Sequence, residues 1–209
     1  MKKYFLDCGA NRGQSFKSFI KDVSDSKDYK FVCFEPSKSK RLREKIKNNI
    51  EDYQKKGYDI EYHNKAIYTY NGTVEFYDMG NESSTTEKEK QAIKSSSKID
   101  VECIDLAEYI LNLPKDAYVE LKLDIEGGEY DVIKHLHSTS ALKKVDKVYL
   151  EPHAVKIKGR KIEDDFNLIE QLADFKIEPY TWNGNKQPPA GSVWTKEKVI
   201  KLWKRKGKY

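Results

Sequence analysis

An apolar run that changes abruptly into a glycine turn, close to the start of the chain, constrains the fold more than any other feature. Residues 4–8 (Tyr-Phe-Leu-Asp-Cys) have the apolar character of a buried strand, and a short polar segment bracketed by Gly9 and Gly13 follows them. Phe16 and Phe19 come next, at the spacing of one helix face. Strand, glycine turn and helix in this order indicate the first half of a βαβ unit, whose helix N-terminus favours an anionic group.

A carboxylate closes each of the first two predicted strands. Asp7 ends the first strand, where it can accept hydrogen bonds from a ligand's ammonium or hydroxyl groups, and Glu35 ends the apolar run 30–34. A βαβ unit places an acid at this second position on a ribose diol. The alternative is an ordinary βαβ unit with a solvated Glu35. The Asp-x-Gly-x-x-x-Gly spacing of the turn differs from the Gly-x-Gly-x-x-Gly of dinucleotide-binding proteins, which disfavours a nicotinamide oxidoreductase.

Three segments together resemble the FkbM-type methyltransferases, which are class I enzymes dependent on S-adenosylmethionine (SAM). They are residues 7–15 (DCGANRGQS), 34–37 (FEPS) and 121–129 (LKLDIEGGE). The resemblance spans roughly residues 3–153, and its most specific part is the Asp-x-Glu-Gly-x-Glu pattern that begins at Asp124. It implies a Rossmann-like class I methyltransferase fold, with a mostly parallel central sheet of about seven strands, helices on both faces and a small antiparallel insertion.

The rest of the chain fits this architecture as a single methyltransferase domain, residues 1–209. Predicted strands and helices alternate without an internal repeat or a linker, which favours a parallel sheet covered on both faces. Asn71-Gly72 predicts a hairpin turn between 67–68 and 73–77. Further strands are predicted at 58–63, 99–104, 117–124, 147–151, 177–182 and, antiparallel at the end, 192–194, with helices at 37–50, 105–113, 129–137, 162–175 and from 196 onward.

The resemblance also implies which residues bind SAM. The glycine turn and the acid that closes the second strand form the pocket, and the segment after the third strand faces the adenine, which adds Asn64 and Ala66. The alternative for these two is that they are plain strand-end residues. The predicted SAM-binding residues are Asp7, Gly9, Asn11, Gly13, Gln14, Ser15, Glu35, Asn64 and Ala66.

Residues 81–98 are rich in Ser, Thr, Lys and Glu, a composition that predicts a surface loop. In the family that the chain resembles, a Ser-rich segment at this point borders the acceptor pocket. We therefore predict that Ser84 and Thr85 bind the acceptor, together with Glu129 and Glu151. Two interpretations of the segment stay open, a lid over the site and a solvated linker.

The acidic turn after the predicted fourth core strand carries the chemistry. Methyl transfer from a sulfonium is an in-line displacement that depends on positioning and on excluding water, and a base or an acidifying metal assists a poorly nucleophilic hydroxyl. Asp124, Glu126 and Glu129 crowd around this turn, and like charges so close raise at least one pKa. His153 follows the fifth strand, and an imidazole has an ordinary pKa of about 6.5. We predict Asp124, Glu126 and His153 as catalytic residues, with either His153 or Asp124 as the base.

Two alternatives stand beside this assignment. The acidic residues can instead stabilise the N-terminus of the following helix, with His153 an ordinary surface histidine. Asp124, Glu126, Glu151 and His153 can also bind a divalent metal, because oxygen-rich clusters suit magnesium or manganese. We expect SAM as the cofactor and no metal.

Composition restricts the compartment and the partners. Charged residues make up 35% of the 209 residues, the formal net charge is +5, and no run approaches the roughly 18 apolar residues of a membrane span. The three cysteines stand in apolar strands, which indicates reduced core residues. Because the first strand begins without a signal peptide before it, we expect a cytoplasmic protein with no membrane partner.

These observations favour an O-methyltransferase that acts on a hydroxyl, above all of a sugar in a glycan or glycoconjugate, although the acceptor class rests on the resemblance alone. One alternative is a glycan- or partner-binding module that kept the fold and lost turnover. Another is an RNA or DNA methyltransferase, prompted by the basic stretch 196–208. Residues 124–127 stand where amino-group base methylation would need Asn/Asp-Pro-Pro-Tyr/Phe. We therefore expect a small-molecule or glycan acceptor and no nucleic acid.

Overall fold

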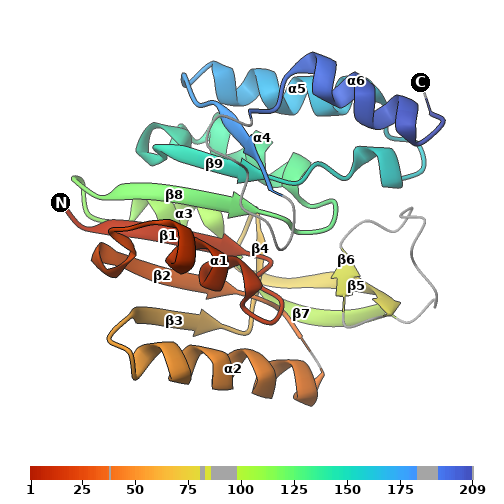
Figure 1. The fold of residues 1–209 in the computed structure, drawn as a ribbon. Coiled ribbons are helices and arrows are strands. Elements are labelled where there is room, and N and C mark those ends of the chain that lie inside the picture. The colour runs from red at the N-terminus through yellow and green to blue at the C-terminus, as the bar shows by residue number, and fades with distance from the viewer. Residues whose placement is uncertain (38, 81–82, 86–97, 183–192, 209) are drawn as a thin grey trace.

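The structure, a computed structural model, describes residues 1–37, 39–80, 83–85, 98–182 and 193–208. Within these ranges the central sheet has six strands, all parallel, in the order β10-β9-β8-β1-β2-β3 (Figure 1). The α/β class and the parallel sheet are therefore confirmed. The strands are β1 (Lys3–Cys8), β2 (Tyr29–Phe34), β3 (Asp59–His63), β8 (Tyr118–Leu123), β9 (Lys147–Leu150) and β10 (Pro179–Thr181).

The predicted last, antiparallel strand at 192–194 lies partly outside the described residues, which resume at 193. In its described part, Val193 forms an antiparallel bridge with Tyr180, and Trp194 N donates to Pro179 O at 2.7 Å. Thr195 then accepts a hydrogen bond from Lys198 N as the N-cap of the next helix.

Helices cover both faces of the sheet, as predicted. Alternate residues of a strand point to opposite faces, and β1 accordingly sends Phe5 to the side of α1 (Gln14–Asp22) and α2 (Lys40–Gln54), and Leu6 to the side of α3 (Leu106–Leu111) and α4 (Glu129–Ser138). Buried aromatic side chains fill the first side, and each contributes about 1.5–3 kcal/mol of hydrophobic stabilisation. The remaining helices, which pack onto α4 and each other, are α5 (Ile162–Ala173) and α6 (Lys196–Arg205).

A second, smaller sheet lies beside the carboxyl ends of the central strands (Figure 1). Its order is β4-β7-β5-β6, with β5 antiparallel to both neighbours and β4 parallel to β7. This sheet provides the predicted small insertion and its antiparallel pairs. Its strands are β4 (Ala66–Tyr68), β5 (Gly72–Gly80), β6 (Ser83–Thr85) and β7 (Lys98–Asp105).

The predicted hairpin around Asn71-Gly72 is wrong, because β7 lies between the two strands that the turn connects. The Asn71 side chain explains the turn differently. Its Oδ1 accepts from Asp105 N at 3.0 Å and its Nδ2 donates to Glu108 Oε2 at 2.6 Å. The turn is thus held against the start of α3, where Asp105 is the N-cap.

Most of the predicted loop at 81–98 cannot be compared with the structure. Its residues 81–82 and 86–97 lie outside the described residues, so neither interpretation of it is tested.

The three cysteines and the helices agree with the expectations from composition. Cys8, Cys33 and Cys103 are buried and free, as expected of reduced core residues. Among the helices that the structure describes, none has both the length and the apolar character needed to cross a membrane.

Candidate active site

Four carboxylates gather at one edge of the central sheet, as predicted from their places at strand ends. Glu151, Asp124 and Glu35 directly follow β9, β8 and β2, and Asp7 is the last residue but one of β1. These four strands are neighbours in the sheet, and their last residues pair in register. The carboxyl-terminal edge of a parallel sheet is where such folds bind ligands.

The glycine turn after β1 is fixed by backbone contacts on both sides. Gly9 N and Ala10 N each donate to Phe34 O at 3.0 Å, which ties the turn to β2. On the β8 side, a Cβ added to Gly9 would lie 1.9 Å from Asp124 O, and Gly9 has a φ of +85°. A residue with a side chain therefore fits neither the space nor the backbone conformation. The turn and the acidic residues after β8 form one packed unit.

The start of α1 continues this turn. Gly13 is the N-cap of α1 with a φ of +81°, and a Cβ there would clash with the Phe16 ring. Gln14 Oε1 accepts from Arg12 N at 2.9 Å, and Ser15 is buried. The structure therefore places Gly13, Gln14 and Ser15 where they hold the turn, and their predicted contacts with SAM remain predictions.

Glu35 is held at the rim of the turn. Its Oε2 accepts from Asn11 N at 2.8 Å, and Asn11 adopts a left-handed backbone with a φ of 47°. Burial raises the pKa of Glu35 to about 7, although the Asn11 hydrogen bond acts in the opposite direction. Glu35 therefore titrates near neutral pH, where a hydroxyl-bearing ligand would favour its ionised form.

A cavity of about 410 Å³ begins at Pro36, the residue after Glu35, and its volume is within the roughly 300–1,000 Å³ typical of small-molecule pockets. Asn64 lines it, and Asn64 Oδ1 accepts from Ser37 N at 3.0 Å and from Tyr62 OH at 3.1 Å. Ala66 lies in β4 at 1% exposure and is not among the lining residues. Of the two residues predicted after the third strand, the structure brings Asn64 to a cavity and buries Ala66. The other lining residues are Pro36, Ser37, Lys65, Asp100, Val101 and Glu102.

A buried lysine beneath the turn was missed by the sequence analysis. Lys122 is 0% exposed, and its Nζ donates to Gly9 O at 2.7 Å and lies 3.3 Å from Asp7 Oδ1 and 3.4 Å from Asp124 Oδ2. Burial disfavours its charge, but Asp124 and Asp7 outweigh this and raise the pKa of Lys122, so it stays protonated. Asp7 is itself 0% exposed, so it supports Lys122 and the turn from below. A charged residue inside an apolar central strand was the available signal.

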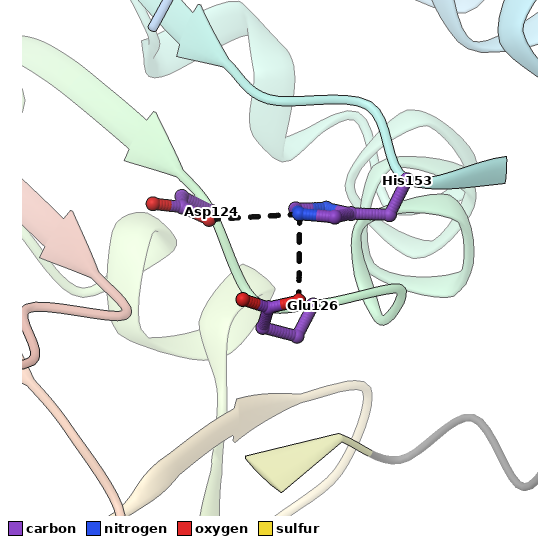
Figure 2. Close-up of side chains that lie close together, drawn as sticks. All are labelled: Asp124, Glu126 and His153. Carbon is purple, nitrogen blue, oxygen red and sulfur yellow. Dashed lines mark ion pairs between the residues drawn. The ribbon is translucent and has the colours of Figure 1, made fainter. Parts of the chain in front are cut away.

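His153 is the centre of the second half of the site. It is 0% exposed, which excludes the surface-histidine alternative. Its Nδ1 lies 2.9 Å from Glu129 Oε1, and its Nε2 lies 3.5 Å from Glu126 Oε2 and 3.9 Å from Asp124 Oδ1 (Figure 2). Glu151 Oε1 is 3.6 Å from the same Nε2. The structure thus brings all three predicted catalytic residues together.

Glu129, predicted to bind the acceptor, lies buried against His153. It is 0% exposed and contacts His153 Nδ1 and Gly127 N, the latter at 2.9 Å. Burial acts to raise its pKa, but His153 and the Gly127 hydrogen bond outweigh burial and lower it. Because an ionised Glu129 can only accept, the His153 ring carries a proton on Nδ1 and donates it to Glu129, and Nε2 faces the other carboxylates. Glu129 therefore orients the ring, and a direct contact with an acceptor would require the ring to move.

A chain of hydrogen bonds supports the backbone of His153 from three helices. Tyr130 OH on α4 accepts from His153 N at 2.9 Å and also from Ala154 N. It donates to Asp165 Oδ1 on α5 at 2.7 Å, and Trp203 Nε1 on α6 donates to Asp165 Oδ2 at 2.7 Å. Burial raises the pKa of Asp165 to about 6. Sequence spacing gave no signal for this network, because its members are far apart in the chain.

The predicted acceptor-binding pair Ser84 and Thr85 belongs to β6, whose backbone pairs with β5. This places them in the second sheet, which lies beside the carboxyl ends of the central strands (Figure 1). Their predicted contact with an acceptor stays a prediction.

Comparison with known proteins adds a family and a solved structure. A family model described as the methyltransferase FkbM domain matches residues 7–175. Among solved structures, the methyltransferase FkbM from Methylobacillus flagellatus KT is similar, with 18% sequence identity and a TM-score of 0.45. That match covers 68% of this chain, and the chain spans only 30% of the length of that protein. No curated protein matches the sequence.

Proposed function

Because the chain belongs to the methyltransferase FkbM domain family, we propose that it transfers the methyl group of SAM to a hydroxyl oxygen, above all of a sugar in a glycan or glycoconjugate. The observation that carries the proposal is the arrangement of the sheet edge. The glycine turn with Glu35 and the cluster around His153 lie next to each other there, joined by the contact between Gly9 and Asp124. Donor and acceptor sites must be neighbours for methyl transfer.

The β2 half of the edge suits the nucleoside part of SAM. We assign the Glu35 carboxylate to the ribose hydroxyls, because Asn11 holds it in place and burial keeps its pKa near 7. We assign the adenine to the cavity that Pro36 and Asn64 line. When bound, SAM would supply a methyl group on a sulfonium: an acceptor oxygen that loses its proton would bond to the methyl carbon, and the carbon–sulfur bond would break to release the neutral thioether.

The β8 and β9 half of the edge suits proton removal. Glu129 orients His153, and Asp124 and Glu126 face its Nε2. A carboxylate, an oriented imidazole and a neighbouring reactive group are the usual parts of a general-base site. Two routes are chemically open, direct proton transfer to His153 or Asp124, and loss of the proton from a hydroxyl that a cation has acidified.

The test of this function has a binding step and a turnover step. Calorimetric titration with SAM should show binding by the intact chain and weaker binding by Glu35→Ala, while NADH should not bind. Incubation with methyl-labelled SAM and a panel of glycans and small hydroxylated acceptors should transfer label to oxygen. SAM binding without transfer to any acceptor would favour the binding-module alternative, and absence of SAM binding would refute the proposal.

A matched pair of variants separates catalysis from folding. Asp124→Asn should reduce turnover far more than SAM affinity, because it removes a charge from the cluster without changing the side chain's size. Asp174→Asn changes a carboxylate that pairs with His137 at 2.9 Å on the surface, and it should retain full activity. Equal activity of the two variants would remove Asp124 from the mechanism.

A further inference from the structure

We propose that Asp124, Glu126 and His153 bind a divalent cation that accepts both nitrogen and oxygen ligands, for which Mn²⁺ is the test ion. This reverses the expectation of a site without a metal. The cation's chemical role rests on the proposed function, but its binding does not. One ligand atom of each residue lies within 4.8 Å of the other two, and Figure 2 shows both carboxylates beside the imidazole ring.

The two separations from His153 Nε2 to the carboxylate oxygens match those around one ion. Metal–ligand distances of about 2.1 Å place two ligand atoms about 3.0 Å apart at right angles and about 4.2 Å apart on opposite sides. His153 Nε2 lies 3.5 Å from Glu126 Oε2 and 3.9 Å from Asp124 Oδ1, between these limits. Both separations are longer than the roughly 2.7–2.9 Å of a charge-assisted hydrogen bond. A doubly protonated ring in contact with these carboxylates would be expected to draw one of them closer.

The contact on the other side of the ring is an independent observation. Glu129 lies outside the proposed ligand set and faces His153 Nδ1 at 2.9 Å, with both residues fully buried. A histidine that binds a metal through one nitrogen commonly donates its other N–H to a carboxylate, which fixes the tautomer and raises the basicity of the ligand. The arrangement of Glu129 and His153 has this form.

The charge around the cluster also favours a cation. Asp124, Glu126 and Glu151 all lie within 4 Å of His153 Nε2. Lys122 and Lys156 offset part of this charge, at 3.4 Å from Asp124 and 3.5 Å from Glu151. A divalent ion would stabilise the gathered carboxylates further, and a hydroxyl bound to it would lose its proton more readily.

The ligand types indicate the class of ion. Carboxylates suit Mg²⁺ and Mn²⁺, whereas an imidazole suits the transition metals. A set of two carboxylates and one imidazole therefore favours Mn²⁺ over Mg²⁺, and competition between the two ions tests the contribution of His153.

The experiment uses the full chain, freed of metal with EDTA and then dialysed. Titration with MnCl₂ at pH 8, followed by the electron paramagnetic resonance signal of free Mn²⁺, should show one site per chain. Glu126→Gln and Asp124→Asn should each weaken binding at least tenfold, whereas Asp174→Asn, the surface carboxylate beside His137, should leave it unchanged. In NMR spectra Mn²⁺ should broaden the ring signals of His153 before those of His137.

The outcomes distinguish a metal site from a cluster of ion pairs around a protonated His153. No Mn²⁺ binding up to millimolar concentration, together with a His153 ring that stays doubly protonated at pH 8, would overturn the metal site in favour of an ion-pair cluster. Binding that is equally tight in Glu126→Gln and Asp124→Asn would place the ion elsewhere and also overturn it. SAM titration of the same samples separates the two proposals, because SAM binding without Mn²⁺ binding refutes only the cation, and the reverse result refutes only the cofactor.

Discussion

If Glu35 binds the ribose hydroxyls as proposed, nucleoside binding should depend on pH in a direction set by the raised pKa of Glu35. Burial raises its pKa to about 7 from an ordinary value of 4.5. Ribose hydroxyls donate to a carboxylate, so a bound nucleoside favours the ionised form and the apo protein must lose a proton to bind. At pH 6 about one tenth of Glu35 is ionised and at pH 8 about nine tenths. The dissociation constant of the nucleoside should therefore be about tenfold larger at pH 6 than at pH 8, a difference in binding free energy of about 1.4 kcal/mol.

Adenosine is the ligand for this measurement, because it carries the ribose diol but lacks the titrating amino group of SAM. Calorimetric titrations at pH 6, 7 and 8 give the dependence of the logarithm of the dissociation constant on pH, which is called the slope below. Glu35→Gln keeps the size and one acceptor oxygen of the side chain but cannot titrate, so its affinity should be flat over this range. Glu44→Gln, on the exposed face of α2, is the control and should keep the wild-type slope. A flat wild-type profile, or a slope that survives in Glu35→Gln, would refute the assignment.

Three substitutions test the packing beneath the site. Gly9→Ala should lower the free energy of unfolding by more than about 2 kcal/mol in urea denaturation, because it forces a Cβ against Asp124 O at a positive φ; full stability would mean that the turn can move aside. Lys122→Met should cost about 3–5 kcal/mol, since it removes the buried cation between Asp7 and Asp124, and a neutral effect would show that a proton on Asp7, whose pKa burial already raises, can replace that cation. Tyr130→Phe leaves two backbone N–H groups after β9 without their acceptor and should cost about 1–3 kcal/mol of stability. It should also lower kcat more than it raises the KM for SAM. A change in KM alone would show that this hydrogen-bond network does not act on the catalytic step.

The sequence predicted the parts of the site that local pattern controls. A strand, a glycine turn and a helix are set by residues within about 15 positions of each other, so Gly9, Gly13 and the strand-end acids could be placed in advance. The pairing of β4 with β7 could not be predicted in this way, because it joins strands more than 30 residues apart in the sequence and no local pattern selects the partner strand or its register. The hairpin signal of Asn71-Gly72 was outweighed by that long-range pairing.

The same limit applies to the side chains that support the site. By strand alternation, Lys122 shares a face of β8 with Tyr118 and Glu120. That its Nζ reaches Gly9 O is visible only in the folded chain, where the glycine turn packs against β8. The contacts that hold His153 come from Tyr130 and Glu129 on α4, more than 20 residues away in the chain. Residue type and spacing identified the groups that the fold gathers at the candidate site, but the groups that influence their protonation come from elements that meet only in the folded chain.

Protonation along the sheet edge divides the site into two halves. Burial acts on both Glu35 and Asp124, yet the pKa of Glu35 is raised while that of Asp124 is lowered, because Lys122 and His153 stand beside Asp124. We therefore expect the β2 half to exchange a proton near neutral pH on binding hydroxyls. In the other half the lowered pKa of Asp124 favours its charged form, as a site for a cation or for a proton taken from an acceptor requires, whereas burial and Asp124 raise the pKa of Glu151. Lys122 lies at the boundary between the halves, so its replacement should disturb both, whereas Glu35→Gln should leave the His153 cluster intact.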